Sequence, residues 1–318
     1  MSAAESPSCR VCEVDLDAPG LVAHDRQYGL GPQCRIVECG TCGVAWTLPF
    51  ANDADLPGFY PSETYSAYHQ PGGLLGRLAF APMNWWRFRG TPFGEPSARP
   101  PGRLLDVGCG RGDLLASFAE RGWEAQGCDL SETAVAVCRE RGLAVRHGAL
   151  PEVAPALPSG AFDVVVYRHA LEHVNDPVRD LEHACGLLAP GGTVLITLPN
   201  WDCWQRRLFR GRWFPLELPR HRIHLSAASL AAVAARAGLA LRWKRTTTSA
   251  LGLPWSLQYV VAGRLLTRGG WRLAAGYLTA VLLYPLTWLA GRIGGSGDFL
   301  HVSLARAEPG LPQQAQVA

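Results

Sequence analysis

Two groups of residues in this chain have the types and spacing that chemistry requires, and the first is a glycine-rich stretch that begins with an acid. It has the pattern D-x-G-x-G-x-G from Asp106 to Gly112. Glycines allow a tight turn and let a ligand approach the backbone closely. The carboxylate of Asp106 would repel a pyrophosphate but would tolerate a cationic sulfonium with an amino-acid tail. The pattern therefore favours such a ligand over a dinucleotide, whose sites use G-x-G-x-x-G.

The second group consists of histidines and a glutamate. His169, Glu172 and His173 follow an apolar run, and His221 and His224 lie in the segment PRHRIHLS. Histidine changes charge near neutral pH, which suits it to act as a general base. Each of these residues is a candidate catalytic group. The alternative that they only pair with neighbours or hold a loop stays open.

Four cysteines form two C-x-x-C pairs near the N-terminus, Cys9 with Cys12 and Cys39 with Cys42. Two such pairs can complete a tetrahedral zinc site. A segment of ~40 residues is too short for a core of its own, so a metal would stabilise it. We expect a zinc ribbon that unfolds without its metal while the rest of the chain stays folded. The alternative is that these are ordinary buried thiols.

The elements that must position these groups follow a strand–helix alternation. The sequence predicts an α/β fold with a Rossmann-like, doubly wound, mostly parallel sheet. Ligands of such sheets bind at the carboxyl ends of the strands, where the glycine turn, Asp129 and His169 are expected to meet. Helices are expected to begin at Ser131, Asp176 and Ser226. The expected strands are 103–107, 124–129, 144–149, 161–169, 193–200, 239–246 and 298–306.

Composition divides the chain into a few parts. Residues 1–47 form the ribbon, 48–100 a connector rich in proline and aromatics that includes a helix, 101–306 the α/β domain and 307–318 a polar, disordered tail. The net charge of +3 is mild and does not favour nucleic acid. No apolar segment precedes the first cysteine, so we expect a cytoplasmic protein with reduced thiols. In the connector, Tyr60, Tyr65 and Tyr68 either roof a cofactor or pack on the domain.

Residues 253–297 are an apolar insertion before the last strand. Leu273 to Gly291 carries no charge for 19 residues and lies between Arg272 and Arg292. A single crossing of a membrane would separate the last strand from its sheet, and Pro285 is expected to break the run. We therefore expect two helices that do not span. Either they attach to the inner face of the membrane as a peripheral surface, or they cover the domain or form a homodimer contact.

Taken together, these motifs resemble the class I S-adenosylmethionine-dependent methyltransferases. The chain is similar to bacterial members with an N-terminal zinc ribbon from polysaccharide and secondary-metabolite pathways. The matching segments are the paired cysteines, FYPSETY, LLDVGCGRGDLL, FDVVVYRHALEHVNDP, LAPGGTVLITLPN, PRHRIHLSAASL and GDFLHVSLAR. The resemblance implies S-adenosylmethionine and Zn²⁺ as cofactors. It implies these cofactor contacts: Asp106, Gly108, Cys109 and Gly110 for the methionine part, Asp129 for the ribose, Leu130, Ala149 and Leu150 near the adenine, and Arg168.

The implied function is methyl transfer to a small-molecule, sugar or lipid-linked acceptor, with oxygen, nitrogen and carbon acceptors all open. One rival is an RNA methyltransferase that uses the ribbon as a nucleic-acid reader. The fourth strand ends YRHALEH and lacks the N/D-P-P-Y type of motif that such enzymes use on base amines. The other rival is a non-catalytic binding protein on the same fold.

Overall fold

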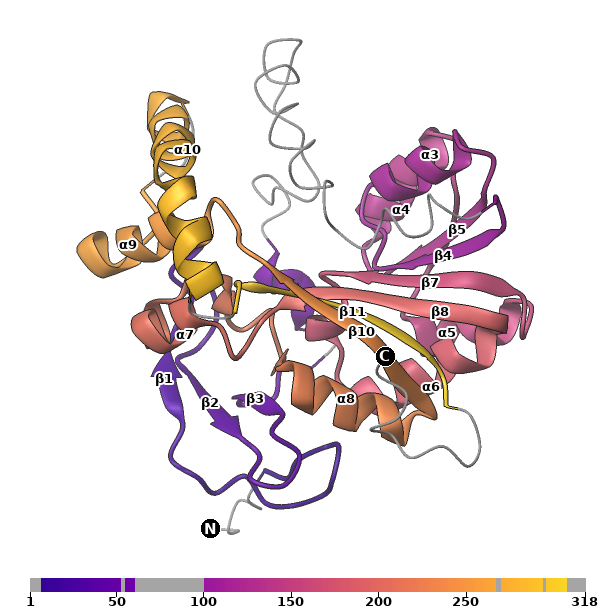
Figure 1. Ribbon diagram of the computed structural model, residues 1–318, viewed down its shortest axis with the longest axis horizontal. Coiled ribbons are helices and arrows are strands. Elements are labelled where there is room, and N and C mark those ends of the chain that lie inside the picture. Colours follow the sequence, from indigo (N-terminus) through magenta and orange to yellow (C-terminus); the bar gives the residue numbers. More distant parts are fainter. Residues whose placement is uncertain (1–6, 53–54, 61–99, 267–269, 294–295, 308–318) are drawn as a thin grey trace.

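The computed structural model describes residues 7–52, 55–60, 100–266, 270–293 and 296–307. The connector helix expected within 48–100, together with Tyr65 and Tyr68, lies outside these ranges, as does the tail from residue 308. The described residues form a large α/β sheet, a small second sheet and a pair of C-terminal helices (Figure 1).

The large sheet has seven strands in the order β10-β11-β8-β7-β4-β5-β6. The strands β4 to β8 pair in parallel, whereas β11 runs antiparallel to both of its neighbours, β8 and β10. This confirms the predicted mostly parallel, doubly wound sheet. The strand bounds are Arg103–Val107 (β4), Glu124–Asp129 (β5), Ala144–His147 (β6), Phe162–Arg168 (β7), Leu188–Pro199 (β8), Leu239–Thr247 (β10) and Phe299–Arg306 (β11).

Helices cover both faces of this sheet. Alternate side chains of its central strand β7 point to opposite faces. Val164 and Val166 pack with α3 and α4, whereas Val165 and Tyr167 pack in the core on the other face, with α6 and α8. Figure 1 shows α3 and α4 on one side of β7 and β8, with α5, α6 and α8 on the other. The helix bounds are Asp113–Ala119 (α3), Glu132–Glu140 (α4), Leu150–Val153 (α5), Pro177–Leu187 (α6) and Ala227–Arg236 (α8).

The helix starts follow from capping side chains, as the sequence predicts. The Ser131 hydroxyl accepts the Ala134 N–H at the start of α4. The Asp176 carboxylate accepts the Arg179 N–H at 3.0 Å, with Pro177 at the first helical position of α6. Ser226 begins α8 in the same way. Short 3-10 turns occur at Leu56–Phe59 (η1), Ala154–Ala156 (η2), Leu171–His173 (η3), Arg210–Arg212 (η4) and Phe214–Leu216 (η5).

The N-terminal ribbon is joined to the α/β domain by a shared sheet and a shared core. Its three strands pair in the order β1-β2-β3 with β9, a two-residue strand from the α/β part. Trp46 on β3 is fully buried in the same hydrophobic cluster as Tyr167 of the large sheet. Loss of the ribbon would therefore expose the core of its neighbour. The bounds are Leu21–Ala23 (β1), Cys34–Glu38 (β2), Ala45–Leu48 (β3) and Ile223–His224 (β9).

The apolar insertion forms two helices, as expected, with α7 near their base. Pro285 lies inside the second helix, which continues through it, so the expected break there was wrong. Pro285 is exposed, so its ring meets solvent rather than a packed neighbour. Among the described residues, no helix combines the length and apolarity needed to cross a membrane. The bounds are Trp204–Phe209 (α7), Gly252–Ala262 (α9) and Gly270–Ile293 (α10).

Candidate active site

The glycine turn at the end of β4 forms an open cradle. Gly108, Gly110 and Gly112 have φ angles of +68°, +54° and +73°, a region that disfavours other residues. A Cβ at Gly108 would meet the Ala170 Cβ at 2.7 Å, so the backbones pack too closely for a side chain there. A Cβ at Gly110 would meet no described atom within 4 Å. The turn thus exposes Gly110 to a space that a ligand can enter.

Asp129, at the end of β5, lies directly against this turn. Its Oδ2 accepts the Gly110 N–H at 2.8 Å and its Oδ1 accepts the Ser131 N–H at 2.8 Å. Burial raises the pKa of the Asp129 carboxyl, and these two backbone donors oppose that shift. A carboxylate oxygen has two lone pairs, so both oxygens keep capacity to accept hydroxyl groups. The next residue, Leu130, leaves 49% of its surface exposed beside this carboxylate.

Asp106 is a buried carboxylate at the floor of the turn. It is 1% exposed, and its Oδ2 has no hydrogen-bond partner among the described residues. Burial raises the pKa of Asp106 to about 7, although nearby Arg168 lowers it. A buried, incompletely paired carboxylate is costly unless a cation or donor meets it. A ligand with a positively charged amino-acid end fits this position.

His169 and Glu172 form a hydrogen-bonded pair at the carboxyl end of β7. The His169 Nδ1 lies 3.2 Å from Oε1 of Glu172. When Glu172 is ionised its carboxylate can only accept, so in that state Nδ1 carries the proton and Nε2 is the basic nitrogen. His169 has a φ of +54°, and its N–H donates to the Thr197 carbonyl at 2.8 Å. Its ring packs edge-on against Phe299, so the imidazole is held from several sides.

Glu172, His173 and His221 form a compact cluster next to this pair. Each offers a ligand atom within 4.8 Å of the other two, and the rings of His173 and His221 lie 4.7 Å apart. Glu172 is 2% exposed, and burial raises its pKa to about 7. The Tyr60 hydroxyl lies 2.9 Å from the Nδ1 of His173, so the first connector tyrosine reaches this cluster.

His224 lies on the far side of this cluster, against the ribbon. Its Nε2 is 3.0 Å from the Thr47 hydroxyl, and its ring lies 5.0 Å from that of Trp201. Burial lowers the pKa of His224 to about 3. These contacts join the two sheets. A role for His224 as a base stays a prediction that the geometry does not favour.

The other predicted cofactor contacts differ in burial. Cys109 is buried in one core cluster and Leu150 in the other, and their contact with the cofactor stays a prediction. The Cys109 thiol lies 3.8 Å from the Gly110 carbonyl. Ala149 is half-buried at the start of α5, and Arg168 ends β7 near Asp106.

The sequence did not reveal a buried ionic cluster between the ribbon and the α/β domain. Arg220 is fully buried, with its Nη1 3.4 Å from the Asp25 carboxylate and its Nε 3.8 Å from that of Glu217. Glu217 has a φ of +40° and also lies 4.0 Å from His221 Nε2. No periodic or local signal pairs Arg220 with Asp25, which lie 195 positions apart in the chain.

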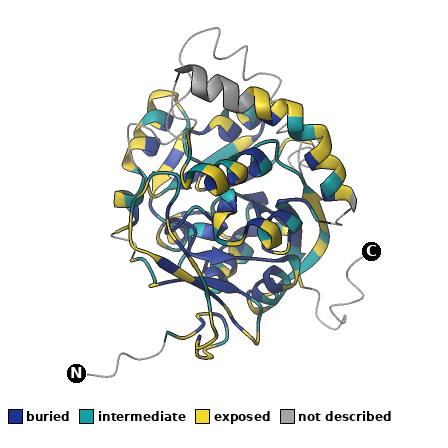
Figure 2. Cartoon of the chain, turned by 90° about the vertical axis from the view of Figure 1, so that its left-hand side faces the viewer, coloured by how far each residue is buried: buried dark blue, intermediate teal, exposed yellow. Residues whose placement is uncertain are grey.

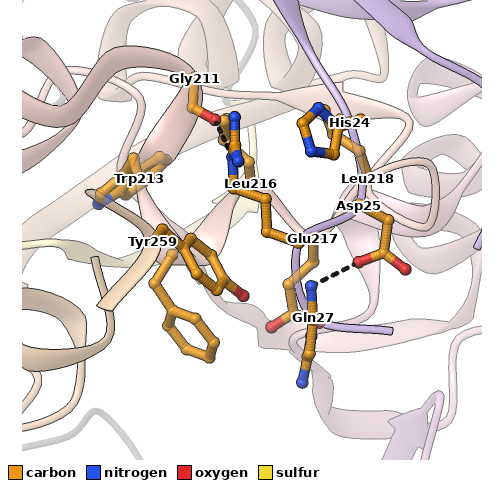
Figure 3. Close-up of a pocket in the computed structure, with 11 residues that line it drawn as sticks. His24, Asp25, Gln27, Gly211, Trp213, Leu216, Glu217, Leu218 and Tyr259 are labelled. Carbon is orange, nitrogen blue, oxygen red and sulfur yellow. Dashed lines mark hydrogen bonds between the residues drawn. The ribbon is translucent and has the colours of Figure 1, made fainter. Parts of the chain in front are cut away.

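A pocket opens beside this ionic cluster, at the junction of three parts of the chain. Figure 3 shows Glu217 and Asp25 projecting toward it, with Tyr259 of α9 on another side. Because Glu217 reaches both this pocket and His221, the pocket borders the histidine cluster. Its wall is completed by His24, Arg26, Gln27, Gly211, Trp213, Phe214, Leu216 and Leu218.

The four paired cysteines converge in the ribbon as the sequence predicts. Their sulfur atoms lie within 4.8 Å of one another, with Cys9 and Cys42 at 3.5 Å and Cys12 and Cys39 at 3.3 Å. The Trp46 ring N–H donates to the Cys9 sulfur at 3.3 Å. Although burial raises the pKa of Cys39, backbone N–H groups lower it to about 7. Four converging sulfurs, one already receiving an N–H donor, suit a tetrahedral Zn²⁺ ion.

Comparison with known proteins decides the family of the α/β part. Residues 87–242 match the sequence model of a family described as a methyltransferase domain. The α/β part of this chain contains a methyltransferase domain.

Curated relatives match this methyltransferase domain over about a hundred residues. The ubiquinone biosynthesis O-methyltransferase of Methylococcus capsulatus is 42% identical over 103 residues, which cover 31% of this chain and 44% of that protein. The protein of the same name from an Azoarcus species is 43% identical over 104 residues, covering 31% and 44%. The chain thus spans less than half the length of these relatives.

Solved structures of similar fold are more distant in sequence. A S-adenosylmethionine-dependent methyltransferase from Archaeoglobus fulgidus is 18% identical, with a TM-score of 0.46, covering 72% of this chain and 100% of that chain. Another from Mesorhizobium loti is 21% identical, with a TM-score of 0.44, covering 65% and 92%.

Proposed function

We propose that this chain transfers a methyl group from S-adenosylmethionine to a hydroxyl oxygen of a small-molecule, sugar or lipid-linked acceptor. The observation that carries the proposal is the buried carboxylate of Asp106 beneath the open turn at Gly110, with Asp129 alongside. The two carboxylates lie at the ends of adjacent parallel strands. Asp106 suits the cationic amino-acid end of such a ligand, and Asp129 suits its ribose.

The residues of the turn divide the binding of S-adenosylmethionine among them. The Asp106 carboxylate faces the ammonium of the methionine end, and the backbone at Gly108 and Gly110 lets that end lie close. Asp129 accepts the ribose hydroxyls, and the adenine covers the exposed side chain of Leu130. When bound, the cofactor supplies a methyl group already activated by the positive sulfur, so the protein mainly orients donor and acceptor.

His169 is the base in this proposal. Glu172 holds its Nδ1 proton, which leaves Nε2 to take the proton of the acceptor hydroxyl as the methyl group is transferred. An oxygen acceptor is supported by the relatives, which are named ubiquinone biosynthesis O-methyltransferases.

We also propose that Cys9, Cys12, Cys39 and Cys42 hold one Zn²⁺ ion with a structural role. The four sulfurs leave no open position for a substrate, and structural zinc sites are closed in this way. The ion would fix the ribbon, and through the ribbon the segment that carries β9 and His221.

Isothermal titration calorimetry with S-adenosylmethionine tests the cofactor half of this proposal, and a His169→Gln variant tests the base. Wild-type protein should bind the cofactor. His169→Gln should bind it with similar affinity but lose roughly 10²- to 10⁴-fold in methyl transfer, measured by mass spectrometry of the acceptor. Wild-type protein that binds no cofactor would refute the proposed function. Unchanged turnover in the variant would refute only the assignment of the base.

A further inference from the structure

The cluster of Glu172, His173 and His221 has features that a general base does not require. Both histidines use Nδ1 in the same way, since Nδ1 of His173 lies 2.9 Å from the Arg220 carbonyl and Nδ1 of His221 lies 2.9 Å from the Pro215 carbonyl. A carbonyl can only accept, so both Nδ1 atoms carry protons, and the Tyr60 hydroxyl, also 2.9 Å from Nδ1 of His173, accepts there as well. Each ring therefore keeps its lone pair on Nε2.

The glutamate completes this arrangement. One carboxylate oxygen of Glu172 accepts from His169, while the other, Oε2, is buried and has no partner among the described residues. One ligand atom from each of Glu172, His173 and His221 therefore lies within 4.8 Å of the others. Metal-binding histidines typically donate their second N–H to a backbone carbonyl or carboxylate, which fixes the ring and its tautomer.

We infer that Glu172, His173 and His221 form a second metal site, distinct from the four cysteines, that binds one divalent transition-metal ion. Their ligand atoms lie within 4.8 Å of one another, so small rotations would bring all three to about 2.1 Å from a shared ion. Imidazole and carboxylate ligands favour Zn²⁺, Fe²⁺, Co²⁺ or Ni²⁺ over Mg²⁺ or Ca²⁺.

The neighbouring charges are compatible with a cation here. Arg220 lies close by, but Asp25 and Glu217 flank its guanidinium. Glu217 also lies 4.0 Å from His221 Nε2, on the pocket side. The local acids therefore offset the arginine, and the remaining carboxylate of Glu172 faces the site.

Three protein ligands leave coordination positions open, as in catalytic rather than structural metal sites. If the proposed function holds, these open positions would bind oxygen atoms of the acceptor. The acceptor would then be a molecule with hydroxyl groups able to coordinate a divalent cation. The metal site itself does not depend on that step.

Titration of the metal-free full chain with Co²⁺ tests the inference, because the two sites differ in their spectra. Cobalt at the four cysteines gives intense thiolate-to-metal absorption, whereas cobalt bound by nitrogen and oxygen does not. We expect two equivalents of Co²⁺ per wild-type chain, only one of them with thiolate absorption. Glu172→Gln and His221→Gln should each lose the second equivalent and keep the first. The matched control is His183→Gln on α6, which should keep both.

Circular dichroism and calorimetry with S-adenosylmethionine on the same samples separate the outcomes. Two bound equivalents that persist in both folded variants would overturn the inference. So would wild-type protein that takes up only the thiolate-bound ion, a result that stands even if both variants fail to fold. Failure to bind S-adenosylmethionine would instead overturn the proposed function and leave the metal count unaffected.

Discussion

At the residue scale, burial of the Asp106 carboxyl carries an electrostatic cost. Its pKa is raised to about 7 by burial, so the folded protein holds this proton more tightly than the unfolded chain does. Folding stability without ligand should therefore fall as the pH rises from the ordinary carboxyl range to about 7. Cofactor binding should show the opposite trend, because only the ionised carboxylate attracts the ammonium group.

The Asp106→Asn variant tests both trends. Without ligand at pH 8 it should melt at a higher temperature than wild type. It should also bind S-adenosylmethionine roughly 10- to 100-fold more weakly at that pH, the loss expected for a charge-assisted hydrogen bond. Wild-type affinity should decline below about pH 7, whereas that of the variant should not. Calorimetry and thermal melts measure these effects, with the exposed Glu124→Gln as control. A variant with wild-type affinity and pH profile would contradict this role.

Two glycines of the same turn should respond differently to the same added methyl group. Gly108→Ala places a Cβ at 2.7 Å from the Ala170 side chain, so we expect a clear loss of thermal stability. Gly110→Ala meets open space and should lose only about 1 kcal/mol from its positive φ. Compared with Gly108→Ala, Gly110→Ala should nevertheless show the larger loss of affinity for S-adenosylmethionine for each unit of stability that it loses. Equal stability losses with unchanged binding would argue against the cradle.

The sequence predicted those site residues that local motifs define. Asp106, Gly110 and Asp129 lie within about two dozen residues of one another in the sequence, so a local motif is enough to identify them. The ion pair of Arg220 with Asp25 was not predictable, because it joins residues 195 positions apart. The sequence also could not tell which histidine faces the crevice, since that depends on how the segment after Glu217 folds over β7.

At the scale of elements, most strands and helix starts could be predicted because periodicity and capping residues specify them. Two features could not. The strand β9 has two residues, too few for any periodic pattern. The helix α10 continues through Pro285, because a proline removes one backbone hydrogen bond and weakens a helix without having to end it.

The pair α9 and α10 presents apolar side chains to solvent, and we propose that this face binds an anionic membrane surface. Figure 2 shows the described part of α10 mostly in the colour of exposed residues. Val261 is 85% exposed and Leu282 is 70% exposed. Arg264 and Arg292 are exposed near them, and the Arg292 guanidinium lies 4.6 Å above the Trp288 ring. Apolar side chains beside arginine and tryptophan suit a lipid headgroup region.

Flotation with anionic liposomes should recover wild-type protein in the lipid fraction, less so at high salt. Replacing Val261 and Leu282 together by glutamine should abolish flotation. The control is Val22→Gln, which removes an apolar side chain of 56% exposure from the ribbon. If wild-type protein stays with the soluble fraction, and sedimentation shows a dimer that the double variant loses, the face is a contact between two copies instead.

At the scale of the whole molecule, the ribbon and the methyltransferase domain share one core. The cluster that holds Cys39 and Trp46 also holds Val233 of α8 and Tyr167 of β7. The expectation from the sequence, a ribbon that unfolds alone, treats the two parts as independent because their motifs are separate along the chain. Only the folded structure reveals that their apolar surfaces meet.

Cys39→Ser should therefore destabilise the methyltransferase domain as well as the ribbon. We expect its melting temperature, followed by circular dichroism, to fall by several degrees or more in one shared transition, with loss of bound zinc. The control is Cys185→Ser, a half-buried thiol outside the metal cluster. Two separate transitions, with the methyltransferase domain melting as in wild type, would support independent domains instead.

The strand β9 also bears on how such a protein can be altered or recombined. Its two residues belong to the chain of one domain and to the sheet of the other, and the Thr47 hydroxyl donates to the carbonyl of His221 at 2.7 Å. A ribbon grafted from another protein would have to match this edge strand, or the histidine segment would lose its register. The ribbon and the methyltransferase domain can therefore be moved into another protein together, but neither can be replaced on its own.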